Sequence, residues 1–212
     1  MRLWELDADL PTQIRLAHEI GVRNLIVPLP WMPPDALARA LNGQMLRVLS
    51  QEMSLDHWKR TAELLNTYGE RLHEAGLSLA YHNHNIDFKK FDGISAYEML
   101  VTATDPRFVR LELDCGWAAS AGLDCTALLK RWPQRYMGIH LKDVGTGLVP
   151  NVAMATDSTE VGSGRLDWPA ILQAAWAAGV REYYIEQEAP YIRPPLESLK
   201  ISFDYLTKIT RA

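Results

Sequence analysis

The sequence lacks the features that would tie it to a disulfide framework, a membrane or nucleic acid. Cys115 and Cys125 are the only cysteines among 212 residues, too few for a disulfide framework and unlike the paired spacing of a zinc ribbon. No stretch approaches the roughly 18 apolar residues of a membrane span, and the first residues lack the apolar core of a signal peptide. No basic run is longer than Lys89-Lys90, and the formal net charge is −4. We therefore expect a cytoplasmic protein with a small-molecule partner and neither a nucleic-acid nor a membrane partner.

The apolar content and the spacing of the apolar residues along the chain predict an α/β protein. Hydrophobic residues make up 48% of the chain, enough for the core of one domain spanning residues 1–212. At Gly21, Gly76 and Gly179 a helical pattern ends and an apolar run follows at once, which is typical of a helix that passes into a strand. The alternation of the two patterns favours a parallel sheet with crossover helices. Strands are expected at 24–29, 77–83, 109–115, 136–142 and 182–187, and helices near 11–20, 54–75, 94–103, 125–132, 167–178 and 196–210.

The sequence signals are clearest for two of the expected helices and for one loop. Ser54 or Asp56 can cap helix 54–75, whose apolar residues recur at helical spacing. Asp167 is the expected cap of the next clear helix, and Trp176 is expected on its buried stripe. Segment 145–165 has glycines, a proline and no periodicity, so it predicts a long loop after the fourth strand.

Polar clusters stand at the ends of four expected strands. Their candidate ligands, His84, Asp114, His140 and Glu186, follow one another at intervals of 30, 26 and 46 residues, about one βα unit each. The carboxyl ends of parallel strands meet on one face, and histidine nitrogen and carboxylate oxygen are ligands of divalent metals. The sequence therefore predicts a metal site. The clusters are Tyr81-His82-Asn83-His84, Leu113-Asp114-Cys115-Gly116-Trp117, Ile139-His140-Leu141-Lys142-Asp143 and Ile185-Glu186-Gln187-Glu188.

These clusters, with the segment from Glu160 to Trp168, resemble the sugar phosphate isomerase/epimerase group of xylose isomerase-like TIM barrels. The resemblance covers residues from about 20 to the C-terminus. It implies a (β/α)₈ fold and a divalent cation, commonly Mn²⁺, Mg²⁺, Co²⁺ or Zn²⁺, held by one residue from each of four strands. Asp114, His140 and Glu186 match three of these positions. The fourth is either His82, where many members have a glutamate, or Asp87.

The resemblance implies enediolate chemistry on a sugar, a sugar phosphate or a keto-sugar. A metal ion polarises the carbonyl and stabilises the enediolate that forms when a base removes the neighbouring proton. Glu186 is the expected base, with His82 as the opposite catalytic group. Isomerisation or epimerisation is the first expectation. Because His82 stands where many members have a second glutamate, dehydration of a keto-sugar or keto-inositol is the alternative.

Further residues are candidates for substrate binding and support. Lys142 follows His140 by two, so it shares the inward face of its strand and can act on an enolate or bind a substrate oxygen. Glu188 and Asp143 are interpreted as groups that support ligands or cap helices. The other candidates for contact with substrate are His84, Arg165, Trp117 and Trp31.

The resemblance also predicts an incomplete barrel. A closed barrel has eight strands, whereas about five C-terminal βα units are recognisable and the first three have no counterpart. An open sheet edge exposes unpaired backbone groups, so we expect a homo-oligomer or association through that edge. A degenerate fragment that binds a sugar without turnover is a further alternative. The apurinic endonucleases, which share the barrel, fit less well because they use several zinc ions and a basic surface.

Overall fold

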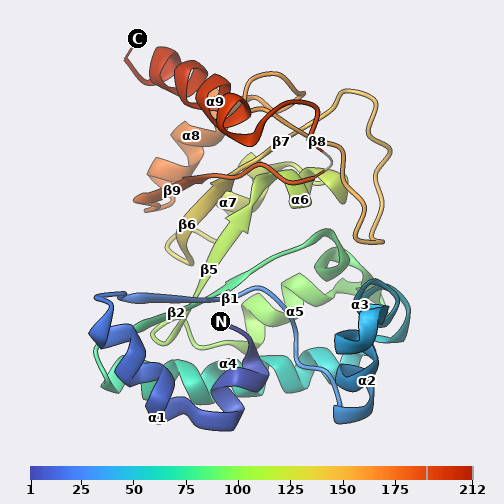
Figure 1. The fold of residues 1–212 in the computed structure, drawn as a ribbon, viewed down its shortest axis with the longest axis vertical. Helices are drawn as coiled ribbons and strands as arrows, with labels where there is room; N and C mark the ends of the chain where they lie inside the picture. The colour runs from blue at the N-terminus through green and yellow to red at the C-terminus, as the bar shows by residue number, and fades with distance from the viewer. Residues whose placement is uncertain (190, 212) are drawn as a thin grey trace. The chain divides into compact units, whose positions relative to one another are not determined.

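The computed structural model describes residues 1–189 and 191–211, and the chain divides into two compact units (Figure 1). The first unit is Met1–Leu111 and the second is Glu112–Ala212. The division falls inside strand β5 (Val109–Asp114), whose first half belongs to one unit and second half to the other. None of the helices in the described ranges is both long enough and apolar enough to cross a membrane.

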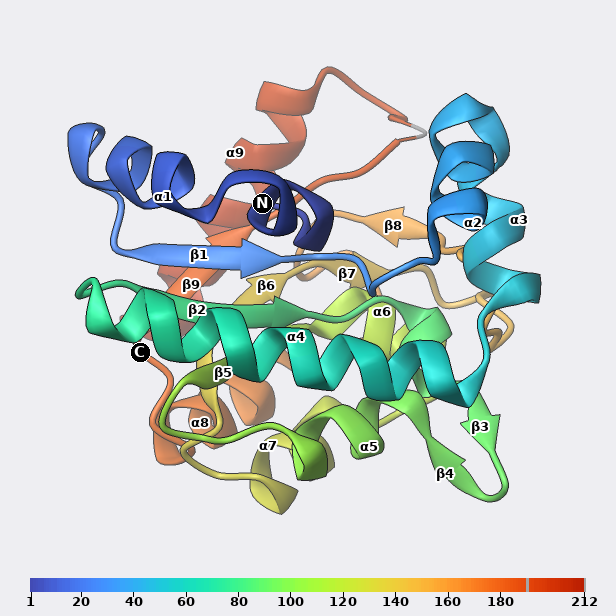
Figure 2. The ribbon, with the colours of Figure 1, turned by 90° about the horizontal axis from the view of Figure 1, so that it is seen from below.

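The first unit is built around a parallel pair of strands. β1 and β2 pair with Asn24 opposite Ser78 and Val27 opposite Tyr81, and the strand order in this unit is β1-β2-β5. Helix α4 runs along β2 (Figure 2). The elements are α1 (Leu3–Glu19), β1 (Asn24–Val27), α2 (Pro34–Arg39), η1 (Ala40–Gln44), α3 (Met45–Arg47), η2 (Val48–Glu52), α4 (Leu55–Glu74), β2 (Ser78–His82), η3 (Asn85–Phe88), β3 (Lys90–Phe91), β4 (Ile94–Ser95) and α5 (Ala96–Ala103).

Helix α4 shows why the chain folds this way. The Ser54 hydroxyl accepts a hydrogen bond from the backbone N–H of His57 at 3.4 Å, which caps the first turn. Trp58, Leu65 and Leu72 recur on one face and are fully buried, so the helix is held by its apolar stripe. The helix ends before Gly76, whose φ of +74° is the left-handed conformation expected of a glycine C-cap.

The second unit repeats the alternation of strand and helix. β6 and β9 pair in parallel with His140 opposite Tyr184 and Leu141 opposite Ile185, and the strand order here is β5-β6-β9. A short antiparallel pair, β7 with β8, closes the loop that follows β6. The elements after β5 are α6 (Cys115–Ser120), α7 (Cys125–Arg131), β6 (Tyr136–Leu141), β7 (Asp143–Val144), β8 (Ser158–Thr159), α8 (Trp168–Ala177), β9 (Glu182–Ile185) and α9 (Pro195–Thr210).

The five expected strands and six expected helices are confirmed, and the fold class is α/β of the TIM-barrel type with an incomplete set of strands. Within the described residues, β1 and β9 each have one neighbouring strand, so the sheet is open where a complete barrel would close. One burial prediction is wrong. Trp176 is 62% exposed, and its ring lies beneath the Arg181 guanidinium at 3.8 Å. Its neighbour Ala175 takes the buried position, because successive helical residues point about 100° apart.

Candidate metal centre

Three strands of the second unit end in side chains that meet. Asp114 is the last residue of β5, His140 lies in β6, and Glu186 directly follows β9. The backbone N–H of Glu186 donates to the Leu141 carbonyl at 3.3 Å, which continues the β6–β9 pairing up to the site. Each of the three residues offers one ligand atom, and these atoms all lie within 4.8 Å of one another. The convergence expected of parallel strand ends is therefore present in this unit.

Glu186 and Asp114 both face the Nδ1 side of the His140 ring. Nδ1 lies 2.8 Å from Oε2 of Glu186 and 3.8 Å from Oδ2 of Asp114. The second oxygen of Asp114 accepts a hydrogen bond from the Trp117 backbone N–H at 2.7 Å, so this carboxylate also caps helix α6. Asp114 is fully buried, whereas His140 and Glu186 remain partly exposed. One nitrogen and two oxygen donors thus face a common space that solvent can reach.

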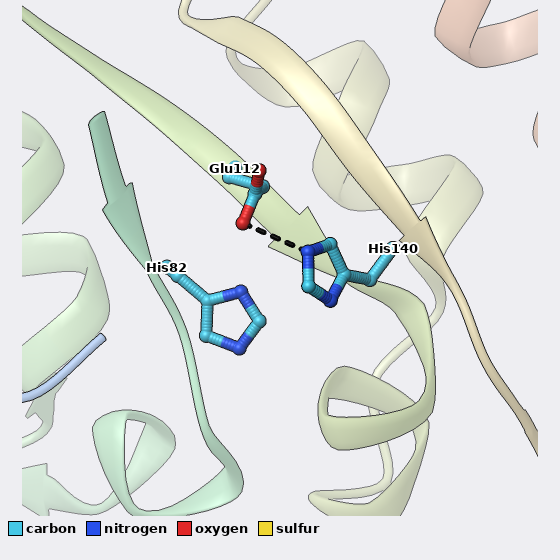
Figure 3. Close-up of side chains that lie close together, drawn as sticks. All are labelled: His82, Glu112 and His140. Carbon is cyan, nitrogen blue, oxygen red and sulfur yellow. Dashed lines mark ion pairs between the residues drawn. The ribbon is translucent and has the colours of Figure 1, made fainter. Parts of the chain in front are cut away.

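Glu112 contacts the other nitrogen of the same ring. Its Oε1 lies 3.0 Å from His140 Nε2 (Figure 3), and the side chain is buried. Burial alone lowers the pKa of His140, but the hydrogen bonds to Glu112 and Glu186 outweigh it and raise the pKa to about 10. Sequence reasoning missed Glu112, although the signal existed. Side chains two apart on a strand share a face, so Glu112 lies on the face of Asp114.

Lys142 supplies a buried positive charge to the cluster. Its ammonium lies 2.9 Å from Asp114 Oδ2, 2.8 Å from Glu186 Oε2 and 3.1 Å from Glu188 Oε2. Burial opposes the charge, but the three carboxylates outweigh it and raise the pKa of Lys142 above its ordinary value. A Cβ at Gly116 would come within 2.7 Å of the Lys142 stem, so this position needs glycine. The inward orientation predicted from the spacing to His140 is therefore observed.

Glu186 and Glu188, the two glutamates that follow β9, have pKa values shifted in opposite directions. Burial acts to raise the pKa of Glu186, but the His140 and Lys142 contacts outweigh it and hold the value well below the ordinary range. For Glu188 burial prevails over the attraction of Lys142, so its pKa is raised. Two carboxylates that share one ammonium thus differ in their affinity for a proton.

Asp143 organises the loop beside the cluster. Its fully buried carboxylate accepts hydrogen bonds from the backbone N–H groups of Gly162, Gly164 and Leu166 at 3.0, 3.3 and 3.2 Å, and from Nε1 of Trp168 at 2.8 Å. This matches its interpretation as a supporting group. The Arg165 guanidinium donates to the carbonyls of Leu148 and Ala119 at 3.2 and 3.0 Å. In this structure Arg165 therefore holds loop backbone.

Of the remaining candidates, Trp117 lies in the second unit with its ring centre 5.3 Å from the Lys142 ammonium, and the others lie in the first unit. His82, labelled in Figure 3, ends β2 and is buried, and its ring packs edge-on against His84 with the ring centres 5.0 Å apart. Asp87 is fully buried and accepts from the His84 backbone N–H at 3.1 Å, and burial raises its pKa well above the ordinary value. The backbone N–H of Trp31 donates to the Thr61 hydroxyl at 3.0 Å, and its ring lies edge-on to His57. The metal-binding role expected of His82 or Asp87, and the substrate contact expected of His84 and Trp31, remain predictions.

Comparison with known proteins decides the family. The family model described as xylose isomerase-like TIM barrel matches residues 5–209. The chain belongs to that family. The resemblance carried by the strand-end clusters is thereby confirmed.

Similar proteins include a rhizopine catabolism protein and inosose dehydratases. The rhizopine catabolism protein MocC of Rhizobium meliloti is 27% identical over 229 aligned residues, which cover 100% of this chain and 68% of MocC. An inosose dehydratase of Geobacillus thermodenitrificans is 25% identical over 198 residues, covering 85% of this chain and 62% of that protein. This xylose isomerase-like chain therefore spans about two thirds of the length of these relatives.

Solved structures show the same fold. A sugar phosphate isomerase/epimerase of Parabacteroides distasonis superposes with a TM-score of 0.73 at 24% identity, covering 96% of this chain and 64% of that one. The IOLI protein, solved with a bound zinc atom, gives a TM-score of 0.65 at 17% identity, covering 93% of this chain and 66% of IOLI. Both support the TIM-barrel assignment of this xylose isomerase-like protein.

Proposed function

We propose that this chain catalyses metal-dependent enolisation of a small polyhydroxylated ketone, either a keto-sugar or a keto-inositol. The observation that carries the proposal is the convergence of Asp114, His140 and Glu186 on one space, with the Lys142 ammonium against two of their oxygens. A donor set for a divalent cation beside a fixed positive charge suits a reaction in which an oxygen becomes negative.

The donor atoms present fit a divalent cation. Asp114 Oδ2, His140 Nδ1 and Glu186 Oε2 would hold it, and His82 or Asp87 would supply the fourth ligand. Nitrogen and carboxylate oxygen donors of this kind accept Zn²⁺, Mn²⁺ or Co²⁺, and Mg²⁺ where water completes the shell. When bound, such an ion polarises the substrate carbonyl and stabilises negative charge on its oxygen.

The residues around the proposed metal position would transfer protons and stabilise negative charge on the substrate. Glu186 is ionised, and its second oxygen can accept the proton from the carbon next to the carbonyl. Lys142, held rigidly against Gly116, supplies positive charge to the enolate oxygen. Glu188, whose pKa is raised, retains a proton more readily than Glu186 and can deliver one to the product. Trp117, His84, Arg165 and Trp31 remain the candidates for sugar contact.

The position of the second proton transfer decides the product. Return of a proton to carbon completes isomerisation or epimerisation, the reaction class predicted from the sequence. Protonation of a departing hydroxyl on the next carbon releases water and leaves an unsaturated ketone. The relatives named inosose dehydratase favour the second outcome, and Glu188 can serve as the acid in either one.

The test is to follow both outcomes in one experiment. Metal-free protein is reconstituted with Mn²⁺, Co²⁺, Zn²⁺ or Mg²⁺ and incubated in D₂O with a keto-inositol and with keto-sugars, with and without phosphate. We expect deuterium at the carbon next to the carbonyl, with loss of water where dehydration occurs. A His140→Ala variant should lose the stoichiometric metal and both signals. Full metal occupancy with neither exchange nor product would contradict turnover, and retained sugar binding would then favour the non-catalytic alternative.

A further inference from the structure

The two nitrogens of the His140 ring contact different carboxylates. Nε2 faces Glu112 at 3.0 Å, whereas Nδ1 faces Glu186 at 2.8 Å and Asp114 at 3.8 Å. An imidazole that binds a metal carries one ring proton, so one nitrogen donates a hydrogen bond while the electron pair of the other binds the metal. The carboxylate that accepts a hydrogen bond from one ring nitrogen therefore leaves the other nitrogen available to a metal.

Glu112 can accept a hydrogen bond from Nε2 and so keep the ring proton on that nitrogen. The carboxylate oxygen of Glu112 lies 3.0 Å from Nε2 and can accept its hydrogen, so this contact keeps hydrogen on Nε2 when a metal binds Nδ1. The side chain is 2% exposed and projects from β5 on the same face as Asp114, so strand geometry fixes it. Nδ1 then presents its electron pair toward Asp114 and Glu186, where the other two donors lie.

We infer that Glu112 is a positioning residue that fixes the tautomer and orientation of His140 and thereby selects Nδ1 as the metal-binding nitrogen. This inference rests on the proposed metal-dependent function. A carboxylate behind a histidine ligand raises the basicity of the ring and holds its plane, and loss of such a partner weakens metal binding about 10- to 100-fold. In this inference Glu112 acts through its 3.0 Å contact with His140.

Two substitutions separate positioning from ligation. Glu112→Gln keeps a side-chain oxygen that can accept from Nε2–H, whereas Glu112→Leu fills similar space without an acceptor. We expect Zn²⁺ affinity, measured by calorimetry, to fall about 10- to 100-fold in Glu112→Leu and to be largely restored in Glu112→Gln. Glu197→Leu, which removes an exposed carboxylate at the start of α9, is the matched control for charge and should bind Zn²⁺ like the wild type.

The decisive measurement is spectroscopic and is made on the wild type and on Glu112→Gln. ¹⁵N NMR of wild-type protein loaded with Zn²⁺ should show His140 with hydrogen on Nε2, and Glu112→Gln should keep that pattern. Hydrogen on Nδ1 in the zinc-loaded wild type would overturn the inference, and so would a Glu112→Gln variant that loses zinc as completely as His140→Ala. Wild-type affinity in Glu112→Leu would overturn it as well. If the wild type binds no divalent metal, the proposed function itself fails, and that result is distinct from these.

Discussion

The Lys142 ammonium lies 2.8 Å from Oε2 of Glu186, the same oxygen that His140 contacts through Nδ1. One carboxylate oxygen is thus shared by two groups that can carry positive charge, in a cluster that also contains Asp114 and Glu188. In the metal-free protein this arrangement offsets the repulsion among the carboxylates. Lys142 therefore has a structural role in addition to the catalytic one proposed for it.

We expect Lys142→Met to destabilise the metal-free protein strongly and the metal-loaded protein much less. Removing one partner of a buried ion pair costs about 3 to 5 kcal/mol of unfolding free energy, because the remaining charges stay uncompensated. A bound divalent ion would supply the missing positive charge and stabilise the folded state by mass action. Urea unfolding with and without Zn²⁺ measures the difference. Lys200→Met, which removes an exposed pair with Asp204, is the control, and equal losses in both Lys142→Met states would contradict the idea.

Glu186→Gln should retain metal and lose turnover. The amide keeps an oxygen for the cation but cannot accept a proton from carbon, so the proton-transfer step suffers most. We expect deuterium exchange into the substrate to fall by at least 10²-fold with metal content near that of the wild type. Metal content by elemental analysis and exchange by NMR are measured on the same sample. Unchanged exchange would exclude Glu186 as the base.

The ends of the strands could be predicted because each strand is an apolar run that is followed directly by a cluster of polar residues. The inward orientation of Glu112 follows from the same alternation that placed Lys142, but Glu112 lies before the end of its strand, and the sequence pattern assigned it no role. Helix α6 was missed because its residues, Cys115 to Ser120, are too few to display a helical period, and the helix depends on the Asp114 cap. Trp176 was misjudged because α8 is apolar almost all round, so its composition does not define one buried face.

The fourth ligand can be assigned by comparing His82→Ala with Asp87→Asn. Burial raises the pKa of Asp87 well above its ordinary value, so the ionised form that would bind a metal is disfavoured at this position. We therefore expect His82→Ala to weaken Zn²⁺ binding more than Asp87→Asn does, by roughly tenfold or more. Calorimetric titration of the two variants against the wild type measures the order. The reverse order would identify Asp87 as the ligand.

Glu160 should make the fold sensitive to acid. Burial would raise its pKa, but hydrogen bonds from Ser198, Arg193 and Thr159 outweigh that and lower the pKa to about 2. Because the folded-state pKa lies below the ordinary value near 4.5, the stabilisation is complete above pH 4.5 and is lost as the pH falls toward 2. Melting temperatures of wild type and Glu160→Gln should differ at pH 6 and converge by about pH 2. A constant difference across this range would contradict the assignment.

For the self-association expected from the sequence, we propose a surface in the second unit. β9 has one neighbouring strand in the described part of the chain, and Tyr184 on it is 41% exposed. Beside it, α8 and α9 flank an apolar groove whose exposed members include Trp176 and Phe203, 62% and 60% exposed. Strands of parallel sheets are normally covered on both faces, and an uncovered edge offers backbone groups and apolar surface to a second copy.

We expect sedimentation velocity to show a dimer or larger assembly at micromolar concentration, and Phe203→Glu to shift it toward monomer because a charge would be buried in the contact. Val149→Glu, at an exposed apolar residue in the loop after β7, tests whether any added acidic charge has the same effect. A wild-type protein that sediments as a stable monomer throughout dilution would refute association through this surface. An assembly that dissociates equally in both variants would show that net charge, and not the groove between α8 and α9, controls it.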